Sequence, residues 1–115
     1  MGVTVSKNCF SGKDQALKAI DAKGLCPRDG AMSAGDLEDV HWHKTSLEIY
    51  VLEGSFETRD AATDRSLLAG PGDLISIPSV THHAARCPQP ARYVVGFESE
   101  AALASFKPER PEDLK

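Results

Sequence analysis

The pattern of apolar and polar positions predicts helices near both ends of this chain. Over residues 11–24 the apolar residues recur three or four positions apart, so one face of an amphipathic helix, centred on Ile20, is expected to pack on the protein. Ser11 is expected to cap this helix and Gly24 to end it. A second short helix is predicted over residues 100–106.

Between these helices the pattern changes to that of an antiparallel β protein. Short runs rich in β-branched and aromatic residues recur between turn residues. Strands are expected at residues 47–52, 55–58, 74–77 and 92–97. Gly54 is expected to end the first strand, and the proline-rich stretch 88–90 to precede the last. Many short strands predict a sandwich or a barrel, and a closed sheet has no exposed edges.

Composition removes several classes of function. The chain has 115 residues, which predicts a single domain over residues 1–115. Thirteen basic against seventeen acidic residues give a formal net charge of -4, and without a basic stripe we expect no nucleic-acid partner. We expect neither a secretion signal nor a membrane span, because no apolar run is long enough. The three cysteines cannot all pair, which favours a reducing, cytoplasmic location.

The candidate chemistry begins at His41 and His43, which flank Trp42. Residues two apart on a strand project from the same face, so both imidazoles could reach one metal ion. An isolated pair of this kind is more often two exposed or hydrogen-bonded histidines around a buried tryptophan. The residues around the pair are therefore needed to decide between the two readings.

Those residues form a larger, two-part pattern. It consists, in chain order, of Gly35, His41, His43, Glu48 and Gly54, and then of Gly72, Pro78 and His83. This paired arrangement resembles the two sequence motifs of the cupin superfamily. The resemblance extends over residues 35–87, roughly half of the chain.

The resemblance implies an all-β double-stranded β-helix, or jelly-roll barrel, with short N- and C-terminal helices and a barrel core at about residues 30–98. It also implies one divalent metal ion in the mouth of the barrel. Carried over residue by residue, the metal ligands are His41, His43 and His83, with Glu48 as a fourth candidate. His82 would face the other side of a strand from His83 and is expected near the surface.

The role of Glu48 depends on the register of its strand. If the strand is aligned on the glycine of the family pattern, Leu47, Ile49 and Val51 line the barrel and Glu48 points outward. This alternation favours a three-histidine centre. A shift of the loop 44–46, or a bulge, would turn Glu48 inward and give four ligands.

Two residues depart from the family pattern. Val80 stands where the second motif usually has glycine, and Cys87 where it usually has asparagine. Cys87 is expected to be a small buried apolar group, with a reactive thiol in the cavity as the alternative. The aromatic residues of the strands are expected to pack in the core rather than to contact a substrate; these are Tyr50, Phe56, Tyr93 and Phe97.

A site of neutral imidazoles suits Fe, Mn, Ni, Cu or Zn, and the sequence does not rank these ions. Fewer than six protein ligands leave coordination positions open to substrate, which favours a metal-dependent enzyme. The first hypothesis is a dioxygenase-like oxidoreductase acting on a small molecule, and the resemblance also covers isomerases and lyases. Without a carboxylate ligand the centre keeps a charge of about +2, which favours anionic substrates.

Two other functions fit the same residues. One is a small-molecule-binding or sensing module without catalysis, and the other is a structural or storage barrel with a vestigial site. The expected partner is a small-molecule ligand or substrate. A homodimer is also expected, because pairing through outer strands would cover apolar residues such as Leu52.

Overall fold

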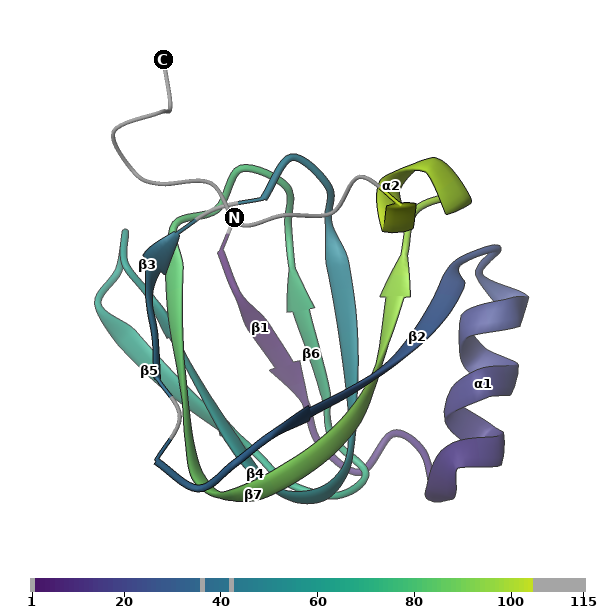
Figure 1. Cartoon of the computed structure of the whole chain (residues 1–115), viewed down its shortest axis with the longest axis horizontal. Helices are drawn as coiled ribbons and strands as arrows, with labels where there is room; N and C mark the ends of the chain where they lie inside the picture. The colour runs from purple at the N-terminus through teal and green to yellow at the C-terminus, as the bar shows by residue number, and fades with distance from the viewer. Residues whose placement is uncertain (1, 36, 42, 105–115) are drawn as a thin grey trace.

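Two long, bent strands carry the fold of this chain (Figure 1). The computed structural model describes residues 2–35, 37–41 and 43–104, the segment 37–41 by its backbone alone. Its elements are β1 (Thr4–Ser6), α1 (Gly12–Ala22), β2 (Cys26–Met32), β3 (Leu37–His41), β4 (Leu47–Asp60), β5 (Arg65–Ala69), β6 (Leu74–Ile77), β7 (His83–Phe97) and α2 (Glu100–Ala104).

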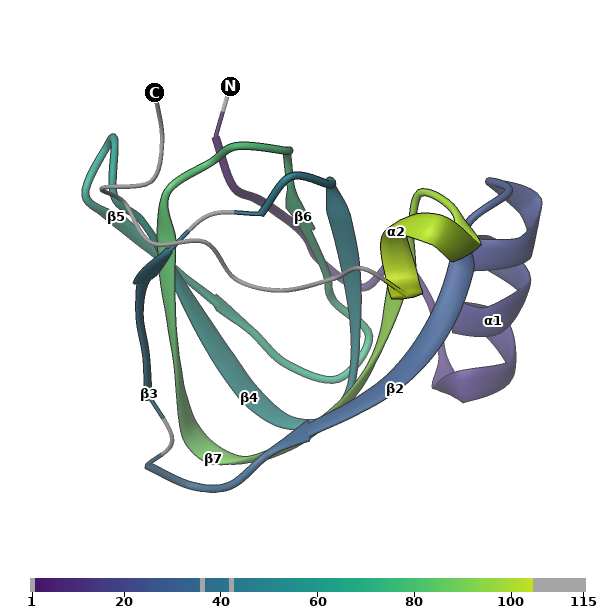
Figure 2. The ribbon, with the colours of Figure 1, turned by 45° about the horizontal axis from the view of Figure 1, so that its top comes forward.

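The two bent strands, β4 and β7, run antiparallel and belong to two layers at once. The first half of β4 pairs with β6 and with the end of β7, and its second half pairs with β5 and with the start of β7. β1 extends the first layer beyond β6, β2 extends it beyond β7, and β3 pairs with the start of β7 in the second layer. Figure 2 shows the layers spreading apart from the bend. The predicted jelly roll with short helices is confirmed.

The predicted strand ends at Gly54 and at residues 88–90 are wrong, because both places are bends within continuous strands. Gly54 has a φ of 76°, and a Cβ added there would overlap the carbonyl oxygen of Pro90. The pairing of β4 with β7 shifts register between Val51 and Glu57, as at a β-bulge. Prolines are tolerated opposite such a bulge because the ladder of hydrogen bonds is already interrupted.

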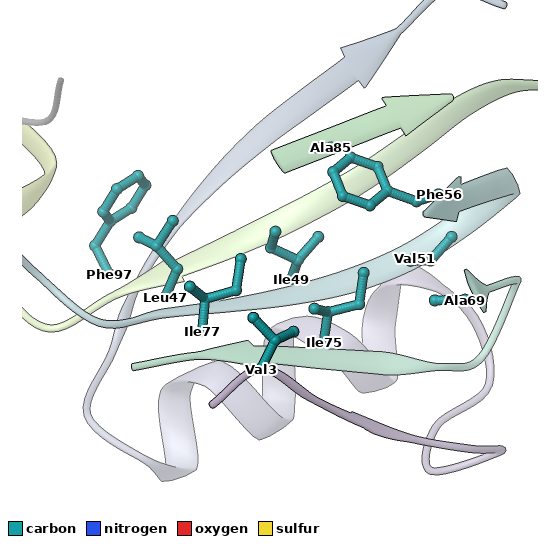
Figure 3. Packing of buried hydrophobic residues seen from close by; sticks show 10 residues of the cluster. All are labelled: Val3, Leu47, Ile49, Val51, Phe56, Ala69, Ile75, Ile77, Ala85 and Phe97. Atoms are coloured by element: carbon teal, nitrogen blue, oxygen red, sulfur yellow. The ribbon is translucent and has the colours of Figure 1, made fainter. Parts of the chain in front are cut away.

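The barrel interior is filled by apolar side chains from both layers, as Figure 3 shows. The cluster consists of Val3, Leu47, Ile49, Val51, Phe56, Ala69, Ile75, Ile77, Ala85 and Phe97. The inward register predicted for Leu47, Ile49 and Val51 is therefore confirmed. Each such large side chain stabilises the fold by roughly 1.5–3 kcal/mol when fully buried.

A second apolar cluster lies outside the barrel, beneath α1. Ala16 and Ile20 of α1 pack on Tyr50 and Leu74, which belong to the outer face of the sheet. Tyr50 thus points away from the barrel and is still buried. Leu52, expected to be exposed until a second copy covers it, is half-buried against the same cluster, so part of its cover comes from its own chain.

Helix α1 is shorter than the predicted span, and Ser11 is its N-cap residue. Among the residues described, the Ser11 side chain makes no capping hydrogen bond; instead its backbone N–H donates to Gln15 Oε1 at 2.7 Å. Gly24, at a φ of 71°, follows the helix end as predicted. The last two residues of the predicted helix 100–106 lie outside the described residues. No helix in the described part has the length and apolar character needed to cross a membrane.

Asp73 ties the turn before β6 to the N-terminal segment. Its buried carboxylate accepts the backbone N–H groups of Gly70 at 2.8 Å and Asn8 at 3.0 Å, and Lys7 Nζ lies 3.0 Å away. Burial alone raises the pKa of a carboxyl group, but these donors outweigh it and hold the pKa of Asp73 below its ordinary value.

Asp73→Asn is expected to lower the free energy of unfolding at pH 7 by roughly 1.5–3 kcal/mol, the range for hydrogen bonds to a charged group. Because the folded-state pKa is depressed, this stabilisation is present above the unfolded value of about 3.9 and is lost as the pH falls through the folded value. Urea unfolding at several pH values should show the parent and the variant converging in acid. A difference independent of pH would contradict the assignment.

Candidate metal centre and cavity

A cavity of about 350 Å³ lies on the inner face of the barrel, near the lower end of the range for small-molecule sites. Six of its lining residues belong to the barrel cluster shown in Figure 3: Leu47, Ile49, Phe56, Ile77, Ala85 and Phe97. Its polar lining side chains are Arg28, Asp29, His43, Thr58, His83 and Tyr93.

His43 and His83 lie face to edge in this cavity. Their ring centroids are 4.8 Å apart, the ring planes meet at 61°, and the two residues are 5% and 2% exposed. His83 is the first residue of β7, whereas His43 follows β3 in a loop and is not part of a strand as predicted. The structure thus brings together two histidines 40 residues apart by way of the loops that flank β3 and β7.

The tautomer of His83 is set by its backbone partner. Its Nδ1 lies 2.8 Å from the carbonyl oxygen of Thr81. A carbonyl only accepts, so Nδ1 carries the proton and Nε2 of the neutral ring keeps its lone pair. Histidine ligands of metal ions are held in the same way, by a hydrogen bond from the second ring nitrogen.

The remaining predicted histidine ligand, His41, is the last residue of β3 and stands opposite His83 in the β3–β7 pairing. The side chain of His41 and the whole of Trp42 lie outside the described residues. Among the side chains that are described, no group of three or more His, Cys, Asp or Glu is placed to hold a metal ion.

Glu48 lies on the other side of its strand, away from the cavity. Its Oε1 accepts hydrogen bonds from Lys23 Nζ at 2.8 Å and from the Tyr50 hydroxyl at 2.8 Å. Burial lowers the pKa of Lys23, but the hydrogen bonds to Glu48 and Tyr50 outweigh it, and the net shift is upward. In this position Glu48 joins the end of α1 to β4.

The loop 44–46, whose shift would turn Glu48 inward, is held in place by Glu98. The Oε1 atom of Glu98 accepts the backbone N–H of Ser46 at 2.6 Å, the Ser46 hydroxyl at 2.9 Å and the Thr45 hydroxyl at 2.9 Å. The Ser46 hydrogen bonds, with that of Thr45, lower the pKa of Glu98. This contact joins residues 52 positions apart, and nothing in the local sequence indicates it.

Glu48→Gln is therefore expected to leave the affinity for a divalent metal ion within about two-fold of the parent. Removing a ligand or its close support would cost ten-fold or more. The variant should lose at most about 1 kcal/mol of stability, because the pair with Lys23 is partly exposed. Competition titration with a chromophoric chelator measures the affinity, and a ten-fold loss would restore Glu48 to the ligand set.

The other residues singled out in the sequence take structural positions. His82 is half-buried and does not line the cavity, and its carbonyl oxygen accepts the N–H of Ala61 at 3.0 Å. Cys87 is 1% exposed and also does not line the cavity; its Sγ lies 3.2 Å from the carbonyl oxygen of Ser55. Its environment fits the expected small buried group.

Three residues that line the cavity were not predicted as site residues. Tyr93, expected from the sequence to pack in the core, lines the cavity wall with Phe56, and their ring centroids are 5.4 Å apart. Thr58 is fully buried, and its hydroxyl has no hydrogen-bond partner within the described part of the chain. Arg28 reaches the cavity from β2. Their roles depend on pairing between distant strands, for which the sequence offers no local signal.

Val80 shapes the loop between β6 and β7, just before His83. Its φ of 56° lies in the left-handed region, where a β-branched residue is strained, and its N–H donates to the carbonyl oxygen of His43 at 2.8 Å. The turn therefore keeps the conformation that suits the glycine of the family pattern.

Val80→Gly is expected to raise the free energy of unfolding by about 1 kcal/mol. The strain of a left-handed residue, about 1–2 kcal/mol, exceeds the backbone-entropy cost of glycine, about 0.5–1 kcal/mol. Little packing is lost, because Val80 is 45% exposed. Val80→Ala keeps the Cβ and should recover less than half of the gain in urea unfolding. Destabilisation by the glycine variant would show that the turn is not strained.

Residues 30–97 match the family model described as a cupin domain, so the chain belongs to the cupin family. No curated protein matches the chain. Among solved structures it is similar to the polyketide cyclase RemF from Streptomyces resistomycificus, with 28% identity, a TM-score of 0.57, and coverage of 65% of this chain and 55% of RemF.

Two further solved structures share the fold. The salicylate 1,2-dioxygenase of Pseudoaminobacter salicylatoxidans has 16% identity and a TM-score of 0.61, with coverage of 74% of this chain and 24% of that protein. The oxalate decarboxylase of Bacillus subtilis, a protein with Mn(II) centres, has 24% identity and a TM-score of 0.59, with coverage of 73% of this chain and 24% of that protein. This chain therefore spans about half, or much less, of the length of these three proteins.

Proposed function

We propose that this chain is a small metal-dependent enzyme that holds one divalent transition-metal ion through His43, His83 and His41 and takes a small substrate in the adjoining cavity. The observation that carries the proposal is the pair of buried imidazoles 4.8 Å apart in the wall of an apolar cavity. The donor set fits such an ion, because the hydrogen bond from His83 Nδ1 to Thr81 leaves the Nε2 lone pair as a ligand. His41 is included because its backbone stands opposite His83.

Glu48 is left out of the proposed ligand set, because its carboxylate is used on the outer face by Lys23 and Tyr50. Three neutral imidazoles leave the full charge of a divalent ion uncompensated, which favours an anionic substrate. When bound, the ion supplies Lewis acidity, or dioxygen activation in the case of Fe(II). The residues of the chain position the substrate, and the apolar walls exclude water and strengthen polar interactions inside.

A dioxygenase-like oxidoreductase is the reaction class that we propose first. The similarity to a salicylate 1,2-dioxygenase supports it, and the Mn(II) centres of oxalate decarboxylase support a transition metal. The similarity to a polyketide cyclase supports a non-oxidative reaction as the alternative.

We also propose a single cupin domain that forms a homodimer in the cytoplasm. The three cysteines form no disulfide in the described part of the chain, which suits a reducing compartment. Light scattering tests the dimer.

Oxygen uptake by the Fe(II)-loaded protein tests the reaction. We expect uptake with at least one member of a panel of small carboxylates, 2-oxo acids and phenols, and none in His43→Ala or His83→Ala. Tight, reversible binding of a panel member without uptake or product would instead select a binding or sensing module. A protein that neither binds nor converts any of them would contradict both functions.

A further inference from the structure

We propose that the cavity binds a small carboxylate with an apolar body, anchored by Arg28 at one end and hydrogen-bonded by Thr58 beside the histidines at the other. This inference rests on the proposed function, because it names the ligand class of the same cavity. Three features of the structure carry it: an uncompensated positive charge, an unsatisfied buried hydroxyl and an aromatic wall.

The charge belongs to Arg28. In β2, Cys26 and Met32 pack against the barrel cluster. Arg28 is two and four positions from them, and residues an even number of positions apart share one face of a strand, so Arg28 lines the inner side. Its neighbour Asp29 is paired with Lys13 at 3.1 Å, whereas none of the ion pairs found between described residues includes Arg28. A planar guanidinium matches a carboxylate with two parallel hydrogen bonds, which makes this anion the best partner.

The hydroxyl belongs to Thr58, which pairs with Ala85 in the β4–β7 ladder, two residues beyond His83. Thr58 lines the cavity, is 0% exposed, and its Oγ1 has no hydrogen-bond partner in the part of the chain that is described. A buried hydroxyl left unsatisfied is costly and calls for an explanation. A polar group on the inner end of a ligand supplies the missing partner.

The aromatic wall depends on Gly30. A Cβ at this position would overlap the Tyr93 ring, which stands opposite Gly30 in the β2–β7 pairing. The glycine therefore leaves room for Tyr93 to lie along the cavity, edge to face with Phe56. Together with Leu47 and Ile49 these rings offer an apolar surface to the body of the ligand.

Calorimetric titration with three six-carbon probes tests the assignment: hexanoate, its neutral counterpart hexanamide, and ω-hydroxyhexanoate. The parent protein should bind hexanoate at least ten-fold more tightly than hexanamide, and Arg28→Gln should abolish this preference. The matched control is Arg92→Gln, an exposed arginine of β7 outside the cavity, which should retain it. The terminal hydroxyl should improve affinity about five-fold in the parent and not at all in Thr58→Val.

Each titration is made with metal-free and with Zn(II)-loaded protein, so that this inference and the proposed metal site fail separately. Loss of the carboxylate preference in Arg28→Gln in both forms supports the anchor even if the protein binds no metal. Equal binding of hexanoate and hexanamide by the parent, or equal effects of Arg28→Gln and Arg92→Gln, would overturn it even if metal binding is intact. A hydroxyl advantage that persists in Thr58→Val would overturn the part assigned to Thr58.

Discussion

Replacing His83 with alanine is expected to lower the affinity of the protein for Zn(II) by roughly 100-fold or more. Loss of a residue that merely supports a ligand costs about 10–100-fold, so loss of the ligand itself should cost at least as much. The metal-free variant should remain folded and lose roughly 1–3 kcal/mol, because it loses the hydrogen bond to Thr81 and the ring contact with His43. Chelator competition measures the affinity, and urea unfolding measures the stability.

His82→Ala is the matched control for this experiment. The two histidines are adjacent in sequence, but only His83 lines the cavity. His82→Ala should therefore keep the affinity of the parent for Zn(II). Unchanged affinity in His83→Ala, or an equal loss in both variants, would refute the proposed ligand.

Replacing Gly54 with alanine is expected to lower the free energy of unfolding by about 2–5 kcal/mol, a large part of the total stability of a small domain. The left-handed backbone at a φ of 76° contributes about 1–2 kcal/mol. The overlap of the new Cβ with the carbonyl oxygen of Pro90 adds the cost of overpacking, about 1–3 kcal/mol, because both strands are fixed there by their pairing.

Gly24→Ala separates the two contributions. Gly24 has a similar φ of 71°, but among the described residues no atom beyond its chain neighbours lies within 4 Å of an added Cβ. This variant should lose only the conformational part, about 1–2 kcal/mol. Urea unfolding followed by circular dichroism compares the two proteins. Equal losses in both variants would show that the bend tolerates a side chain at Gly54.

Local patterns predicted those parts of the fold that depend on a single element. Alignment of the strand on the glycine of the family pattern predicted the inward face of Leu47, Ile49 and Val51 correctly, and alternation along the strand then placed every second residue in the interior. The face of α1 around Ile20 followed from helical spacing in the same way. The strand ends at Gly54 and at residues 88–90 were misjudged, because glycine and proline mark a bend as readily as an end.

The parts of the site that escaped prediction depend on contacts between distant segments. The outward position of Glu48 is reinforced by Glu98, which directly follows β7 and holds the loop 44–46 through hydrogen bonds to Ser46. Thr58 and Arg28 become cavity residues only through the pairing of β4 and β2 with β7. A single sequence contains no signal for such register, whereas the spacing of His43 and His83 within two motifs did indicate their approach.

Metal analysis of protein purified without an affinity tag and without added metal tests the proposed metal centre. We expect about one equivalent of a divalent transition metal per chain, lost in a variant that combines His43→Ala with His83→Ala. Parent protein that stays metal-free after incubation with Fe(II), Mn(II), Ni(II), Cu(II) and Zn(II) in turn would contradict it.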